Sequence, residues 1–144
     1  MLLGEHEHAL DYKNRLTLPA KFRQSFSDGL VVGRGMDGCL VVYPRDGWDG
    51  FVESRLAGLD PLSREARQMS RFFFSGASEA DLDRQGRVMI PQLLVERAGL
   101  TREVVVAGLR DHLEIWDRAS WRDQMNEVEG SAELVAERLA AKQD

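Results

Sequence analysis

A nine-residue motif occurs twice in this chain of 144 residues. Residues 11–19, Asp-Tyr-Lys-Asn-Arg-Leu-Thr-Leu-Pro, return 72 residues later as residues 83–91, Asp-Arg-Gln-Gly-Arg-Val-Met-Ile-Pro. In each copy an aspartate precedes an arginine by four positions, and an apolar, middle, apolar triplet and a proline follow. With one inserted residue the similarity continues, aligning Gly35 with Gly108, Leu40 with Leu113, Tyr43 with Trp116, and Trp48 with Trp121. The chain therefore consists of two copies of one unit.

The repeat predicts two units, residues 1–75 with a core at about 5–52, and residues 76–144 with a core at about 76–126. A unit of this size buries little apolar surface alone, and repeated units usually gain stability by packing on one another. We expect the two copies to pack together. A pair that does not close on itself leaves surface for neighbouring chains, so we also expect a homo-oligomer.

Local patterns in the two copies predict the same elements. Residues 11–14 and 83–86 are rich in turn formers, and the alternating triplets that follow are typical of strands. Together with the residues before each turn, at 5–10 and 80–82, the pattern predicts two hairpins. Asn14 and Gly86 hold equivalent places, and both residue types tolerate a positive φ.

Further elements follow in each copy. Pro19 and Pro91 predict the starts of short helices, and Gly29 and Gly99 their ends. Strand pairs are predicted at 30–32 with 40–43 and at 104–107 with 113–116. Amphipathic helices are predicted at 48–59, 62–73 and 121–128, and residues 131–142 show a weaker helical pattern. The fold class predicted is α+β, with a mainly β core and flanking helices.

The composition is typical of soluble globular proteins, with 43% hydrophobic and 30% charged residues. The longest apolar runs are only a few residues, too short to cross a bilayer. The first residues show no secretory signal pattern, so we expect a cytoplasmic location. Cys39 lies inside a strand pattern without a second cysteine in the chain, and we expect it to be a buried thiol.

Charge is distributed unevenly along the sequence. The net charge of −5 argues against nucleic-acid binding when it is averaged over the molecule. Residues 11–23 nevertheless hold four cationic side chains and only one acidic one, whereas residues 127–144 hold five acidic and two cationic side chains. A local basic surface is therefore compatible with the acidic average, although either cluster could equally be a solvated face.

Several other patterns favour structural interpretations. Residues 33–38 match Gly-x-Gly-x-x-Gly, but a strand pattern follows them where a dinucleotide site needs a helix. His6, His8 and His112 lack neighbouring ligands at metal-site spacing, so we expect no metal and no cofactor. No nucleophile motif singles out a catalytic residue, and we expect no enzyme activity. The aromatic residues fall at helix or strand spacing, which favours a core or subunit interface over base stacking.

The two Asp-x-x-x-Arg turns leave three interpretations open. In the first, Asp11 and Asp83 accept turn amides and pair with Arg15 and Arg87 for stability alone. In the second, the arginines contact guanine, and nearby cations neutralise phosphate. In the third, the turns bind another anion. Chemistry alone does not choose among them.

The duplicated motif resembles the paired motifs of the MraZ family. Further stretches are similar to that family along almost the whole chain, namely residues 40–44 with Trp48, 75–79, 98–104 and 113–117. Asn14 departs from the family pattern, which usually has glycine there. The resemblance implies two tandem swapped-hairpin units of the AbrB-like, double-split β-barrel kind, assembled into a ring-shaped homo-oligomer.

The resemblance also implies a function, that of a bacterial transcription regulator at the nucleoid. Such a protein binds repeated G-rich boxes in double-stranded DNA and commonly represses its own cell-division and cell-wall gene cluster. Carried over by position, Arg15 and Arg87 become candidates for DNA contact, Lys13 and Arg84 candidates for phosphate contact, and Asp11 and Asp83 turn stabilisers. Because cations cluster around the first turn, we expect Arg15 to contribute more to binding than Arg87.

One alternative from a different class remains. The same fold could serve as an oligomeric interaction scaffold that does not touch DNA, with both Asp-x-x-x-Arg turns purely structural.

Overall fold

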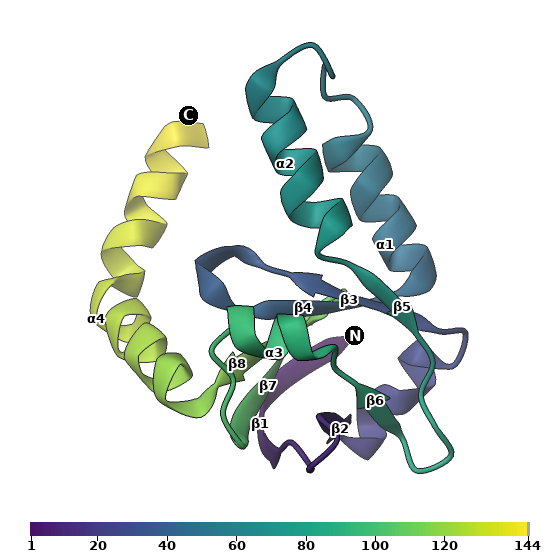
Figure 1. The fold of residues 1–144 in the computed structure, drawn as a ribbon. Coiled ribbons are helices and arrows are strands. Elements are labelled where there is room, and N and C mark those ends of the chain that lie inside the picture. Colours follow the sequence, from purple (N-terminus) through teal and green to yellow (C-terminus); the bar gives the residue numbers. More distant parts are fainter. Residues whose placement is uncertain (144) are drawn as a thin grey trace.

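The fold is α+β with a mainly antiparallel β core, as the sequence predicts (Figure 1). The computed structural model describes residues 1–143. Six strands form one sheet, in the order β1 (Leu2–Ala9), β7 (Glu103–Arg110), β8 (Leu113–Asp117), β4 (Leu40–Pro44), β3 (Leu30–Arg34) and β5 (Ser78–Ala80). The two remaining strands, β2 (Arg15–Thr17) and β6 (Arg87–Met89), form a separate antiparallel ribbon.

The two halves of the chain exchange strands. β1 of the first half pairs along its whole length with β7 of the second, and β5 of the second half pairs with β3 of the first. The ribbon likewise takes one strand from each half. Neither half therefore completes its sheet without the other.

This exchange corrects the two predicted hairpins. The strands on either side of each turn do not pair with each other, because their backbone groups bond to the opposite half of the chain. Only the turns themselves are as predicted. In the first, the Asp11 amide donates to the Arg15 carbonyl at 3.0 Å, and in the second the Asp83 amide donates to the Arg87 carbonyl at 2.9 Å.

Helices begin and end near the predicted residues. After Pro19 and Pro91 come the 3-10 helix η1 (Ala20–Phe26) and the helix α3 (Gln92–Arg97). Between the halves, α1 (Arg45–Phe51) continues into the π-helical turn η3 (Val52–Leu56), and α2 (Arg64–Ser75) packs beside them (Figure 1). The Ser63 side chain caps α2 by accepting the Ala66 amide. The last helix, α4 (Arg118–Gln143), runs without interruption and stands away from the sheet over much of its length (Figure 1).

The core lies between the sheet, the ribbon and the two short helices that follow the ribbon strands. Its most deeply buried side chains come from both copies of the repeat: Leu16, Leu18, Phe22, Phe26, Leu30, Val32, Leu40, Val42, Val88, Ile90, Leu113 and Ile115. Leu16 and Val88 face each other across the ribbon and are both fully buried. Burial of this central pair anchors the ribbon to the rest of the molecule.

Two further expectations concern the chain as a whole. Within the described residues, no helix is long and apolar enough to cross a membrane. Cys39 is buried as expected, its Sγ donating to the Met36 carbonyl at 3.2 Å. The boundary between the two predicted units, at residues 75 and 76, stays a prediction, and the last residue of the second unit, 144, lies outside the described residues.

Candidate nucleic-acid interface

The β2–β6 ribbon brings the two copies of the motif together. Arg15 lies opposite Met89, Leu16 opposite Val88, and Thr17 opposite Arg87. Side chains alternate between the faces of a strand, and directly opposed residues of an antiparallel pair share a face. Because the central Leu16–Val88 pair points into the core, the two flanking pairs point outward. The outer face of the ribbon is thus formed by Arg15, Thr17, Arg87 and Met89.

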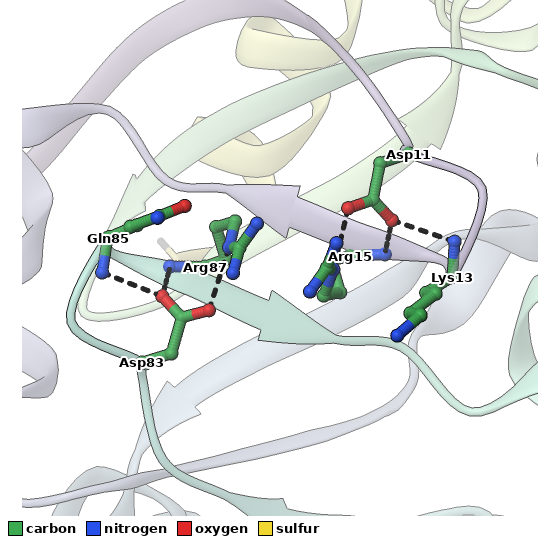
Figure 2. A network of polar contacts seen from close by, with 6 residues as sticks. All are labelled: Asp11, Lys13, Arg15, Asp83, Gln85 and Arg87. Carbon is green, nitrogen blue, oxygen red and sulfur yellow. Dashed lines mark hydrogen bonds and ion pairs between the residues drawn. The ribbon is translucent and has the colours of Figure 1, made fainter.

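The first turn is organised around the Asp11 carboxylate (Figure 2). Its Oδ1 accepts the amides of Lys13, at 2.9 Å, and Arg15, at 2.8 Å, while Oδ2 accepts Nε of Arg15 at 2.6 Å. Desolvation acts to raise the pKa of Asp11, but these hydrogen bonds outweigh it and hold the pKa below its ordinary value. The carboxylate therefore fixes both the turn and the arginine side chain.

The second turn repeats this arrangement around Asp83, at the other end of the ribbon (Figure 2). Oδ1 accepts the amides of Gln85 and Arg87, both at 2.9 Å, and Oδ2 accepts Nε of Arg87 at 2.7 Å. The hydrogen bond from the Arg87 amide is the main reason that the pKa of Asp83 lies below its ordinary value. The repeated sequence thus produces a repeated polar network with approximate two-fold symmetry.

Each arginine is held by only one edge of its guanidinium group. Among residues 1–143, Nε makes the one side-chain hydrogen bond of Arg15 and of Arg87. The two side chains keep 21% and 25% of their surface exposed. The hydrogen bond to Asp11 also raises the pKa of Arg15, so its charge is secure. Such a guanidinium group can still offer its terminal nitrogens as a fork to an acceptor pair outside the protein.

Lys13 and Arg84 do not hold equivalent places in the two turns, although the family resemblance makes both candidates for phosphate contact. Counting from each aspartate, Lys13 corresponds to Gln85, and Arg84 to Tyr12. Lys13 and Arg84 are both exposed. Nζ of Lys13 lies 5.6 Å from the centre of the Tyr12 ring. Both cations thus lie beside the ribbon, but at different positions relative to its arginines.

One further cation of this surface lies where its position in the sequence does not indicate. Arg23, from η1, donates from Nε to the Leu18 carbonyl at 3.1 Å, and its side chain lies directly over Gly86 in the second turn. Its position in the sequence groups Arg23 with the cations of the first turn, because only the folded chain brings residues 23 and 86 together. Its place in the charged surface is therefore beside Arg87 rather than beside Arg15.

The other patterns in the sequence form no comparable site. His6 and His8 lie on β1, whereas His112 stacks on Tyr43 with ring centres 4.6 Å apart. In the described part of the chain, no three histidine, cysteine or acidic side chains are grouped as metal ligands. The glycine-rich segment 33–38 contains the end of β3 and the turn that leads to β4, and a strand follows it as the sequence predicts. Five of the eleven aromatic residues contact one another where α1 and α2 meet β4, namely Tyr43, Trp48, Phe51, Phe72 and Phe73.

Comparison with known proteins agrees with the duplicated pattern. Residues 1–71 and, separately, residues 73–142 match the MraZ protein family, which is described as antitoxin-like. The chain belongs to the MraZ family. This confirms the resemblance that the paired motifs indicate.

Relatives in the MraZ family match nearly the full length of the chain. A protein of Roseiflexus castenholzii named transcriptional regulator MraZ is 44% identical over 140 residues, which are 97% of each chain. Proteins of the same name from Syntrophomonas wolfei and Clostridium acetobutylicum are 43% and 41% identical, over 96% and 97% of each chain.

Proposed function

We propose that this chain is a transcription regulator that binds double-stranded DNA through the outer face of the β2–β6 ribbon. The names of its MraZ relatives support the regulatory function. The observation that supports the binding surface is the pair of guanidinium groups on one face of the ribbon, each positioned by an aspartate through Nε alone. A structural role in the turn and a binding role are thus compatible in the same arginine.

The geometry suits the major groove of DNA. That groove admits a two-stranded β-ribbon, and guanine presents there the O6 and N7 acceptors that an arginine binds with two parallel hydrogen bonds. Arg15 and Arg87 are therefore the proposed base contacts. Lys13 and Arg84, at the margins of the same surface, are the proposed phosphate contacts, while Asp11 and Asp83 stabilise the turns. Fixing each side chain beforehand lowers the entropy lost on binding.

The family resemblance extends the proposal to the assembly and its target. The protein would form a ring-shaped homo-oligomer of tandem AbrB-like units and bind repeated G-rich boxes, repressing its own cell-division and cell-wall gene cluster from the nucleoid in the cytoplasm. Several ribbons bound to repeated boxes gain affinity through their high effective concentration. That gain offsets the net charge of −5, which disfavours binding by a single copy.

The test is binding to a duplex with tandem G-rich boxes and to a shuffled duplex of the same composition, across a series of salt concentrations. We expect the wild type to prefer the boxes and to lose affinity as salt rises, because phosphate contacts release counterions. Arg15→Ala should remove the preference while the protein stays folded. Arg64→Ala removes an exposed arginine at the start of α2, away from the ribbon; it is the control and should bind as the wild type does.

The alternative function is an oligomeric scaffold that does not touch DNA. It is favoured by the completeness of the Asp11 and Asp83 networks, which stabilise their turns without any partner. Under this alternative, Arg15→Ala and Arg87→Ala lower the melting temperature, and the wild type binds box and shuffled duplexes equally weakly. A preference for the boxes that depends on the arginines contradicts the scaffold.

A further inference from the structure

The two ends of the ribbon differ chemically despite their similar backbones. Arg15 has Met89 directly across the ribbon, and its guanidinium carbon lies 5.7 Å from the centre of the Tyr12 ring. Arg87 instead has Thr17 across the ribbon. Met89 is 58% exposed and Tyr12 85% exposed, so the Arg15 end presents apolar surface to solvent.

Met89 is placed to reach the same partner as Arg15. Directly opposed side chains of an antiparallel pair have Cβ atoms roughly 4.5–5.5 Å apart and project from the same face. Successive base pairs are about 3.4 Å apart along the helix axis. The separation of the two Cβ atoms thus corresponds to between one and two base-pair steps, which places the base pair next to a guanine held by Arg15 within reach of the flexible Met89 side chain.

The chemistry of Met89 selects among the groups found there. Its side chain is flexible and apolar and offers no hydrogen-bond donor. The C5-methyl group of thymine is the apolar group that base edges present in the major groove. Thr17, at the corresponding place beside Arg87, is shorter and carries a hydroxyl group. The two ends of the ribbon therefore differ in the reach and in the hydrogen-bonding capacity of the side chain opposite the arginine.

We propose that Met89 is a specificity-determining residue that packs against a thymine methyl group next to the guanine bound by Arg15. This inference rests on the proposed DNA-binding function and adds to it a base preference at one end of the ribbon.

The experiment begins with selection of bound sequences from a random duplex library by the wild-type protein. In the selected duplex, each thymine is then replaced in turn by deoxyuridine, which removes only the C5-methyl group. We expect one replacement, beside a guanine whose contact depends on Arg15, to weaken wild-type binding about fourfold, the value of one buried methyl-sized group. Met89→Gln, similar in length but polar, should bind the thymine and deoxyuridine duplexes equally.

Two further variants control for folding and for general effects. Met89→Leu keeps an apolar side chain and should keep the penalty for deoxyuridine. Met69→Gln, at a 40% exposed position on α2, should behave as the wild type. Melting temperatures establish that each variant is folded.

The outcomes separate this inference from the proposed function. If the wild type selects no sequence from the library, the DNA-binding function fails and this inference fails with it. If it selects a sequence but no deoxyuridine replacement weakens binding, or if Met89→Gln suffers the same penalty, the assignment of Met89 alone is overturned.

Discussion

Asn14 and Gly86 show how one turn geometry accommodates two residue types. Both residues adopt positive φ, 58° for Asn14 and 75° for Gly86. Asn14 has room for its side chain, which donates from Nδ2 to Oε1 of Gln92 at 2.6 Å. A side chain at position 86 would instead collide with Arg23, which lies directly over the glycine. The departure from glycine at position 14 is thus explained by what packs on each turn.

Exchanging these residues should have unequal effects. Gly86→Asn must displace the Arg23 side chain, so we expect it to lower the free energy of unfolding by about 1–2 kcal/mol. Adding Arg23→Ala should restore part of that loss by removing the collision. Asn14→Gly, the matched control, loses one hydrogen bond and should cost no more than about 1 kcal/mol. Urea denaturation measures all three, and a Gly86→Asn protein as stable as the wild type contradicts the packing described.

The turn carboxylates make stability depend on acid pH. Hydrogen bonds to Asp11 and Asp83 hold both pKa values below the ordinary 3.8. Their contribution is fully present above that value and is lost as pH falls through the lower pKa of the folded state. We expect Asp11→Asn with Asp83→Asn to flatten the dependence of the melting temperature on pH below about 4. Identical pH profiles for the variant and the wild type would show that the networks contribute nothing.

The structure changes one expectation about the arginines. Charge along the sequence favours a larger contribution from Arg15, but Arg23 lies beside the second turn and evens the balance. The two side chains also have similar exposed fractions and the same contact with an aspartate. We therefore expect Arg15→Ala and Arg87→Ala to weaken binding to the boxes by factors of the same order. A loss more than about tenfold larger for Arg15→Ala than for Arg87→Ala in titrations of both variants would instead support the ranking that the sequence favours.

Sequence patterns predict the positions of the strands and helices better than they predict which strands pair. Neighbours within a few residues determine the triplets at 16–18 and 88–90, the strands at 30–32 and 40–43, and the short helices after the prolines. Alternation identifies which face of a strand is buried, but not which strand lies beside it. The predicted hairpins were wrong for this reason, because the strands that pair with β1 and β2 lie in the other half of the chain. Arg23 was misplaced for the same reason.

Helix α4 joins the two helical segments predicted at 121–128 and 131–142 into one continuous helix. Its apolar side chains recur at intervals of four and three residues, the spacing of a coiled-coil seam, at Trp121, Met125, Val128, Ala132, Val135 and Leu139. Near its start, Trp121 donates from Nε1 to the Glu5 carboxylate on β1. Farther along, Val135 and Leu139 are 42% and 56% exposed. This half of the seam is available to another copy of the chain in the proposed oligomer.

Polar substitution of the seam tests that contribution to assembly. We expect the double variant Val135→Glu with Leu139→Glu to form a smaller oligomer. Its melting temperature should be nearly that of the wild type, because both side chains are exposed within one chain. The control pair, Glu133→Gln and Glu137→Gln, alters the same helix off the seam and should assemble normally. Sedimentation velocity gives the size. Unchanged assembly by the seam variant would remove α4 from the interface.

At the scale of the whole molecule, exchange of strands places one copy of the motif at each end of a single ribbon. The ribbon lies at the opposite end of the molecule from the α1–α2 hairpin, and the second half of α4, where residues 127–143 hold four acidic and two cationic side chains, also lies away from it (Figure 1). This separation keeps the cations of the ribbon apart from the acidic half of α4. The two copies of the motif, which by themselves indicate two units, thus form one surface with one copy at each end.

The most direct test of this account replaces guanine by 7-deazaguanine in the tandem-box duplex, which removes the N7 acceptor and little else. We predict that wild-type binding weakens about tenfold at each guanine contacted, since a charged hydrogen bond is lost. The double variant Arg15→Ala with Arg87→Ala should bind both duplexes equally. If 7-deazaguanine leaves wild-type affinity unchanged, or weakens the double variant equally, these arginines do not contact guanine N7 in the major groove and the central claim is wrong.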